Sequence, residues 1–135
     1  MAVNKIDYLN KSNKLDDFLS QIVFIVKSEF KCQAFYEYHS FDKNSNDEAL
    51  KFQLTLILIE MGLNFSDLEG KNIFLCTIAV EIDEYDDVVS SNRIVKSDWD
   101  VEFYLEGILD EKITSVGLIN KGDKKYRKLN FLMKL

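Results

Sequence analysis

Carboxylates and aromatic rings gather between Glu81 and Glu111, and this segment has the strongest chemical character in the sequence. It holds eleven acidic residues and only two basic ones. Carboxylates at this density can transfer protons, bind metal ions or attract a cationic partner. The candidate residues are Asp83, Glu84, Tyr85, Asp86, Asp87, Asp98, Trp99, Asp100, Glu102, Tyr104 and Glu106.

Catalytic and metal-binding patterns are absent from the sequence. A calcium loop needs a glycine at its sixth position and a later glutamate, but the acids from Asp83 to Asp87 are followed by no such glycine. Asp98 and Asp100 form a pair that can do acid–base work in a cleft, which stays open as an alternative. No phosphate loop, Cys/His metal spacing or GxSxG motif occurs. We expect no catalytic residue, metal or cofactor, and therefore no enzyme.

The histidine and the cysteines are interpreted as structural. His39, the one histidine, lies in an aromatic segment and is expected at the surface, with a general-base role as the alternative. Cys32 and Cys76 lie in or beside apolar runs and form no disulfide framework, which indicates reduced thiols in the core of a cytoplasmic protein.

Composition and charge restrict the partners. The 135 residues are expected to form one domain, residues 1–135, with a net charge of −6. This charge argues against broad nucleic-acid binding. Residues 121–135 carry six bases and one acid, which favours a strand that balances acidic neighbours over a nucleic-acid patch. The apolar runs Ile22–Val26 and Leu54–Ile59 are too short to cross a membrane.

Two helices are predicted in the first half of the chain. Apolar residues at helical spacing predict a helix from about Lys14 to Lys31, and the aromatic run Gln33–Phe41 predicts a short strand or extended segment. A second helix is predicted from Asn46 to Met61, with Gly62 at its end. This helix is apolar nearly all round, which indicates either the centre of the fold or an oligomer interface.

Strands are predicted in the second half. Asn72–Ile82 is apolar on both faces, as expected of a central strand. A long loop from Asp83 to Asp98, with a short helical turn near Val88 as an option, precedes a half-buried strand at Val101–Leu105, whose outer face would carry Glu102, Tyr104 and Glu106. Two further strands, Ile113–Asn120 and Tyr126–Leu135, would be joined by a hairpin turn at Lys121–Lys124.

These elements predict an α+β fold. Two N-terminal helices would pack on one face of a mainly antiparallel sheet of four to five strands, joined as a meander. In that arrangement the two acidic clusters of the segment from Glu81 to Glu111 meet on one side of the sheet, with aromatic residues between them.

In size, acidity, cytosolic character and absence of catalytic motifs, the chain resembles the immunity proteins of bacterial toxin systems, including those of contact-dependent inhibition. The resemblance implies a protein that binds one cognate toxin domain. We therefore expect an inhibitor that occludes the active site of a basic toxin, with a nuclease as the expected class. Asp83, Glu84, Asp86 and Asp87 would mimic phosphates, while Tyr85, Trp99 and Tyr104 would pack against the toxin.

Two alternatives belong to other classes of protein. The first is a small-ligand-binding or enzymatic domain with a pocket between helices and sheet, lined by Tyr36, Tyr38 and His39, with Asp98 or Asp100 as its polar group. The second is a homo-oligomer that associates through the second helix.

Overall fold

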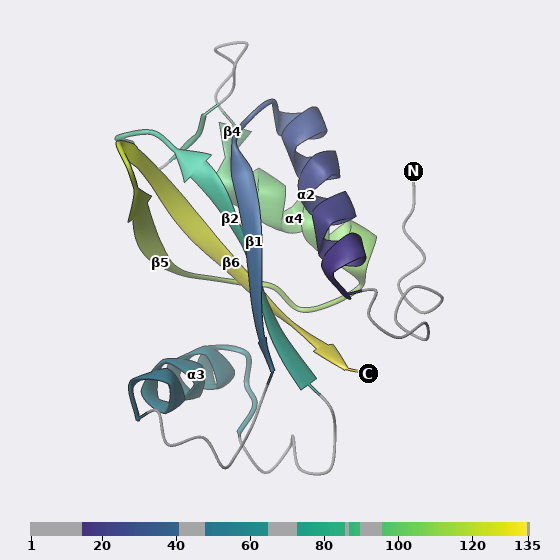
Figure 1. Ribbon diagram of the computed structural model, residues 1–135, viewed down its shortest axis with the longest axis vertical. Helices are drawn as coiled ribbons and strands as arrows, with labels where there is room; N and C mark the ends of the chain where they lie inside the picture. The colour runs from purple at the N-terminus through teal and green to yellow at the C-terminus, as the bar shows by residue number, and fades with distance from the viewer. Residues whose placement is uncertain (1–14, 41–47, 65–72, 86, 90–95, 135) are drawn as a thin grey trace.

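The computed structural model describes residues 15–40, 48–64, 73–85, 87–89 and 96–134, and these form an antiparallel sheet with helices on both faces (Figure 1). The described elements, in chain order, are α2 (Leu15–Phe30), β1 (Ala34–Ser40), α3 (Glu48–Glu60), β2 (Ile73–Ile82), β3 (Asp87–Val88), β4 (Lys96–Ser97), α4 (Asp98–Leu109), β5 (Thr114–Lys121) and β6 (Lys124–Lys134). The predicted α+β class is confirmed.

Strand β2 is the centre of the six-stranded sheet. It pairs with β6 along one edge, while β1 pairs with its other edge, with Tyr36 opposite Ile78. Near Glu81 the neighbour along this edge of β2 changes from β1 to β3. The Glu81 backbone N–H donates to the Gln33 carbonyl just before β1 (2.9 Å), and the Glu81 carbonyl accepts from the Val89 N–H just after β3 (3.0 Å). The prediction of a central strand at 72–82 is confirmed.

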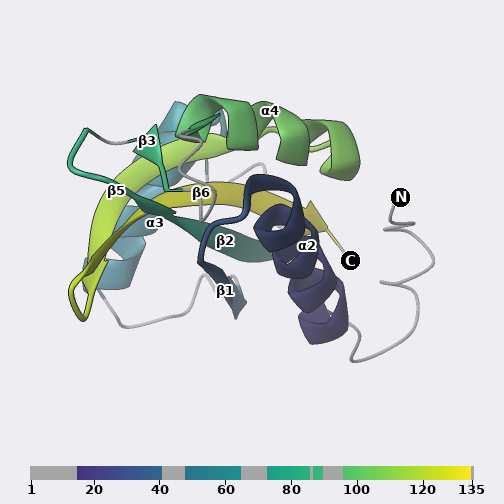
Figure 2. The same ribbon diagram turned by 90° about the horizontal axis from the view of Figure 1, so that it is seen from above.

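The helices lie on opposite faces of this sheet. Alternate side chains of β2, including Ile78 and Val80, share one core cluster with α2 and α4. The intervening side chains Ile73 and Leu75 belong to a second cluster under α3. Figure 1 shows α3 at one end of the sheet, whereas Figure 2 shows α2 and α4 beside each other on the other face.

Two parts of the predicted architecture are therefore wrong. The first two helices do not pack on one face, because a strand that is apolar on both faces needs cover on both. Of the described helices, only α2 precedes the sheet, since β1 comes between α2 and α3. The strands also do not follow one another as a simple meander, because β6 lies between β2 and β5.

The predictions for α2 and α3 are confirmed, and the ends of both helices lie within two residues of the predicted bounds. Phe18, Ile22 and Val26 of α2 are buried at helical spacing. Helix α3 ends with Gly62 in the left-handed region (φ 75°), where the Leu63 N–H donates to the Leu58 carbonyl (2.8 Å). Glycine adopts this backbone geometry without the steric cost that a Cβ would add.

The largest error concerns residues 98–109, which form helix α4 and not a loop end followed by a strand. Val101, Leu105 and Leu109 recur every four residues and are buried, while Phe103, which alternates with them in a strand pattern, is exposed. The expected helical turn near Val88 is also wrong, since Val88 lies in β3. Pairing of β3 with β4 shortens the predicted loop.

The later hairpin agrees with its prediction. Lys121 pairs with Lys124 at the end of the β5–β6 ladder, and Gly122 has a φ of 63° in the turn between them. Glycine at this place allows the tight reversal.

We expect Gly107→Ala to stabilise the protein by about 0.5–1 kcal/mol, because alanine favours the helix and restricts the unfolded chain. A Cβ at Gly107 would have no atom within 4 Å, and this glycine lies inside α4. Urea unfolding measures the change.

Gly62→Ala is the matched control. Its Cβ would also meet nothing within 4 Å, but φ is +75°. We expect a loss of about 1–2 kcal/mol from backbone strain. A destabilising Gly107→Ala would contradict the helical assignment of residues 98–109.

Candidate functional site

The two acidic clusters are joined by the short ladder between β3 and β4. Asp87 lies opposite Ser97, so the turn after β2 adjoins the start of α4. From this junction α4 runs away along the sheet (Figure 1), so its later acids lie further from the turn by about 1.5 Å per residue. The expected gathering of both acidic clusters on one side of the sheet, with aromatic residues between them, stays a prediction.

Several acids of the first cluster stabilise the fold itself. One carboxylate oxygen of Asp83 accepts hydrogen bonds from the backbone N–H groups of Tyr85 (2.8 Å) and Asp87 (3.0 Å), which shapes the turn. Glu81 lies 3.8 Å from the Lys124 ammonium. Glu84 and Tyr85 face solvent, with Tyr85 76% exposed, while Asp87 is half-buried. Asp86 lies outside the described residues.

In the second acidic cluster, the helical geometry of α4 turns some side chains toward solvent and others toward the core. Asp100 and Glu106 are exposed, and Glu102 is half-buried. Tyr104, predicted on an outer strand face, packs edge-on against Phe30 with ring centroids 5.5 Å apart. Its ring therefore contributes to the core cluster under α2 and α4. Asp98 and Trp99 begin α4, and their side chains lie outside the described part.

Phe103 is the surface residue that the strand interpretation missed. It is 56% exposed and lies on the side of α4 opposite Val101 and Leu105. Asp100 and Glu106, each three residues away, are exposed beside it, and Asp110 is exposed just past the end of α4. We call these four residues, Asp100, Phe103, Glu106 and Asp110, the α4 face. A helical projection of the sequence would have revealed it.

The alternative pocket of Tyr36, Tyr38 and His39 does not form. The hydroxyls of Tyr36 and Tyr38 both donate to the Asp16 carboxylate of α2, at 3.3 Å each. Burial, together with this carboxylate, raises the pKa of both phenols. His39 projects from the opposite face, because successive side chains of a strand alternate.

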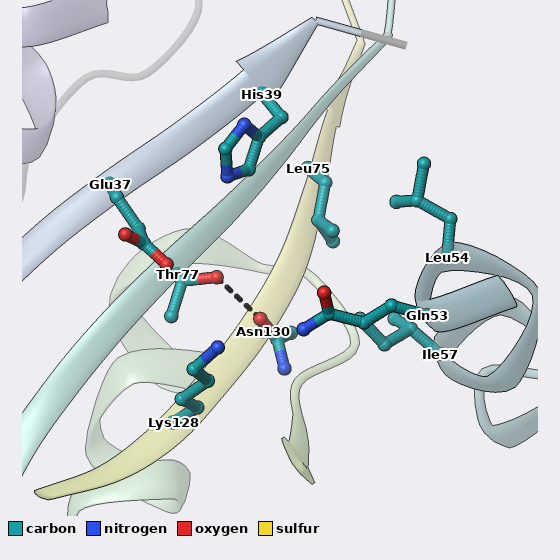
Figure 3. A pocket seen from close by; sticks show the side chains of 9 residues that line it. All are labelled: Glu37, His39, Gln53, Leu54, Ile57, Leu75, Thr77, Lys128 and Asn130. Carbon is teal, nitrogen blue, oxygen red and sulfur yellow. Dashed lines mark hydrogen bonds between the residues drawn. The ribbon is translucent and has the colours of Figure 1, made fainter. Parts of the chain in front are cut away.

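A different pocket lies between α3 and the sheet (Figure 3). Its volume is about 50 Å³. Three strands and one helix supply the lining residues, which are Glu37, His39, Gln53, Leu54, Ile57, Leu75, Thr77, Lys128 and Asn130. Of these, only His39 was considered for a pocket from the sequence.

A second exposed surface follows the outer side of α3. Phe52, Leu56 and Ile59 recur at helical spacing and are 67%, 50% and 67% exposed. We call them the α3 stripe. Large apolar residues gathered in this way are typical of an interaction surface.

The remaining candidates for chemistry in the described part of the chain are groups of metal ligands and the two thiols. Within it, no three His, Cys, Asp or Glu side chains are grouped so that they could hold a metal ion. Cys32 and Cys76 are free and buried, in agreement with the sequence interpretation. Burial raises the pKa of the Cys32 thiol to about 11 and that of Cys76 to about 12, which disfavours the nucleophilic thiolate.

Comparison with protein-family models, curated proteins and solved structures gives no match for this chain. Among the described helices, none has the length and apolarity needed to span a membrane. The basis for a functional proposal is therefore the two exposed helix surfaces and the pocket.

We expect the free energy of unfolding to fall as pH rises above about 9, partly through Cys76. Its native pKa of about 12 exceeds the ordinary value of 9.0, so only the unfolded thiol ionises between these values. Below pH 9 both states hold the proton, and the effect vanishes.

Urea unfolding at about pH 7.5 and 10.5 measures this dependence in wild type and Cys76→Ala. We expect the free energy of unfolding to fall more steeply with pH in wild type than in Cys76→Ala. The two slopes should differ by at most about 1.4 kcal/mol per pH unit. Equal slopes would show that the thiol ionises alike in both states.

Proposed function

We propose that this chain is a cytoplasmic immunity protein that binds a basic toxin domain, with a nuclease as the expected class, and covers its active site. The observation that carries the proposal is an exposed Phe103 surrounded by acids on the α4 face. Exposed aromatic rings bury large apolar area at interfaces, and surrounding carboxylates select a cationic partner. No catalytic, metal or cofactor site is part of this proposal.

The shape of α4 favours close contact around Phe103. Gly107 lies one turn further along the helix, and a Cβ there would have no atom within 4 Å. One flank of the phenyl ring therefore lacks a neighbouring side chain at position 107. A partner backbone or ring can approach the helix there, which suits a packed anchor at the centre of an interface.

Charge supports the same surface. Exposed carboxylates at Glu84, Asp100 and Glu106 have the sign that a phosphate-binding cleft attracts. The screening length at cellular salt is about 8 Å, so acids within one helix face act together on an approaching cation. Asp83 is a weaker phosphate mimic than the sequence suggested, because one of its oxygens already accepts two backbone hydrogen bonds.

The basic C-terminal segment fits a balancing role better than nucleic-acid binding. Lys124 approaches Glu81 at 3.8 Å, and the Lys121 ammonium lies 4.4 Å from the centre of the Phe35 ring. Both cations therefore have partners within the fold.

The direct test uses a candidate toxin domain, prepared without its catalytic activity. We would take it from the C-terminus of a large exported protein, if the gene next to this one encodes such a protein. Phe103→Ala should weaken binding by about 30-fold or more, as truncation of an interface anchor does. Asp100→Lys with Glu106→Lys should slow association by about tenfold at low salt and reduce its salt dependence. Surface plasmon resonance measures both.

Glu48→Lys with Glu60→Lys is the matched control, since it makes the same charge change at exposed positions of α3. We expect its affinity to stay within about threefold of wild type. The proposal would be overturned if the toxin domain did not bind. It would also be overturned if the α3 double variant and the α4 double variant lost affinity equally.

Self-association through the α3 stripe is the second part of the proposal. Burial of Phe52, Leu56 and Ile59 against a second copy would remove their exposed apolar surface from water. We expect light scattering to show a concentration-dependent dimer for wild type and a monomer for Leu56→Glu. A monomeric wild type at all concentrations would remove this role.

A further inference from the structure

Strand β1 forms one edge of the sheet, and its outer side is unpaired in the described part of the chain. Among the described strands, β1 pairs only with β2. The register runs without a shift from Ala34, opposite Val80, to Ser40, opposite Phe74. A regular edge strand of this length presents backbone donors and acceptors with which another chain can pair.

The hydrogen-bond pattern identifies the backbone groups of β1 that point outward. Glu81 of β2 donates its backbone N–H to the Gln33 carbonyl, so residues 35, 37 and 39, which follow Gln33 at intervals of two, direct their backbone groups toward β2. The intervening residues direct theirs away from the sheet. These outward residues are Ala34, Tyr36, Tyr38 and Ser40.

The other edges of the described sheet are blunted, which makes β1 the exception. Strand β5, at the opposite edge, loses its register with β6 between Ser115 and Leu118, where Gly117 has a φ of 74°. Strand β4 is only two residues long. Bulges and short strands are common means of preventing unwanted pairing, and β1 has neither.

Carboxylates flank the β1 edge on both faces of the sheet. Glu37 projects from the middle of β1 on the α3 side, where it also lines the pocket. On the α2 side, Asp16 accepts hydrogen bonds from the hydroxyls of Tyr36 and Tyr38 at 3.3 Å each. Strand β1 itself contains no lysine or arginine. A strand added beside β1 would therefore meet a negative charge on either face.

One cation contacts β1, and it does so from the inner side. The Phe35 ring packs edge-on against Tyr126 of β6, with centroids 5.0 Å apart, and the Lys121 ammonium lies 4.4 Å from the centre of the Phe35 ring. Because β6 lies beyond β2 when counted from β1, this cation lies over the sheet and not beside its outer edge.

We propose that the outer edge of β1 binds an extended basic segment of another protein by strand addition. The backbone of the segment pairs with the outward groups from Ala34 to Ser40, and its lysine or arginine side chains approach Glu37 or Asp16. A second copy of this chain fits less well. In the fully overlapped antiparallel pairing of two β1 strands, Glu37 would lie directly opposite its counterpart, and like charges at such positions are destabilising.

This proposal does not rest on toxin binding at the α4 face. Phe103 projects from a helix that lies over the sheet, whereas the β1 site is the edge of the sheet itself. The two surfaces share no residue and are tested with different probes. Failure of one proposal therefore leaves the other intact.

The test is an NMR titration of the isotope-labelled protein with a capped heptapeptide in which lysine alternates with threonine. Near saturation, the outward amides of Tyr36 and Tyr38 should exchange with solvent at least about fivefold more slowly, because they then donate to the peptide backbone. Amides of α4 serve as the reference and should keep their exchange rates.

Two control peptides separate charge from strand pairing. One has glutamate in place of lysine. The other keeps its lysines but carries methyl groups on its central backbone nitrogens, which removes the donors and prevents close approach to an edge. We expect neither peptide to slow exchange at Tyr36 and Tyr38.

Charge reversal locates the contact. Glu37→Lys should weaken binding of the lysine peptide at least about fivefold, because an attraction across the strands becomes a repulsion. Glu60→Lys is the matched control at an exposed position of α3. That end of α3 lies toward β5, since the Lys112 ammonium donates to the Met61 carbonyl at 3.0 Å. We expect its affinity to stay within about twofold of wild type, and the same spectra check the folding of both variants.

Four results would overturn the proposal. They are absence of saturable binding, equal effects of the lysine peptide and either control peptide, equal losses in Glu37→Lys and Glu60→Lys, and outward amides that already exchange more slowly as the concentration of the protein alone rises. The last result would assign the β1 edge to a second copy of this chain.

Discussion

The two apolar faces of strand β2 are the constraint from which the architecture follows. Ile78 and Val80 project to one side, and Ile73 and Leu75 to the other. Burial of each such side chain stabilises the fold by about 1.5–3 kcal/mol, so neither face can remain in water. One layer is made by α2 with α4, and the other by α3. Because α3 covers only one end of its face, polar side chains occupy the border, where the pocket lies.

Local patterns in the sequence predict the elements whose signals have one interpretation. Helix α2 has a clear helical period, Gly62 ends α3, and the turn at Gly122 joins β5 to β6. Residues 98–109 fit two periods instead. Val101, Phe103 and Leu105 alternate as in a strand, yet Val101, Leu105 and Leu109 also share one helix face. The need to cover the sheet beside α2 decides between them, and no local pattern carries that information.

The candidate sites were predictable only in part. The sequence identified the acidic segment, and pairing of β3 with β4 joins its two halves. It could not distinguish acids that shape a turn, such as Asp83, from those that face solvent, because backbone hydrogen bonds decide this. Phe103 is recognisable as a surface residue only once residues 98–109 are known to be helical. The pairing of Thr77 with Asn130 in the pocket depends on strand order, which places β6 beside β2.

Hydrogen–deuterium exchange tests the central claim most directly, by comparing the protein alone with the protein bound to the toxin domain. Slowed exchange is predicted for residues 98–109 of α4, for Asp110 and for the adjoining turn at residues 83–85, with α3 unchanged. Protection confined to residues 48–60 of α3, with α4 exchanging as in the free protein, would contradict the assignment of the binding surface to the α4 face.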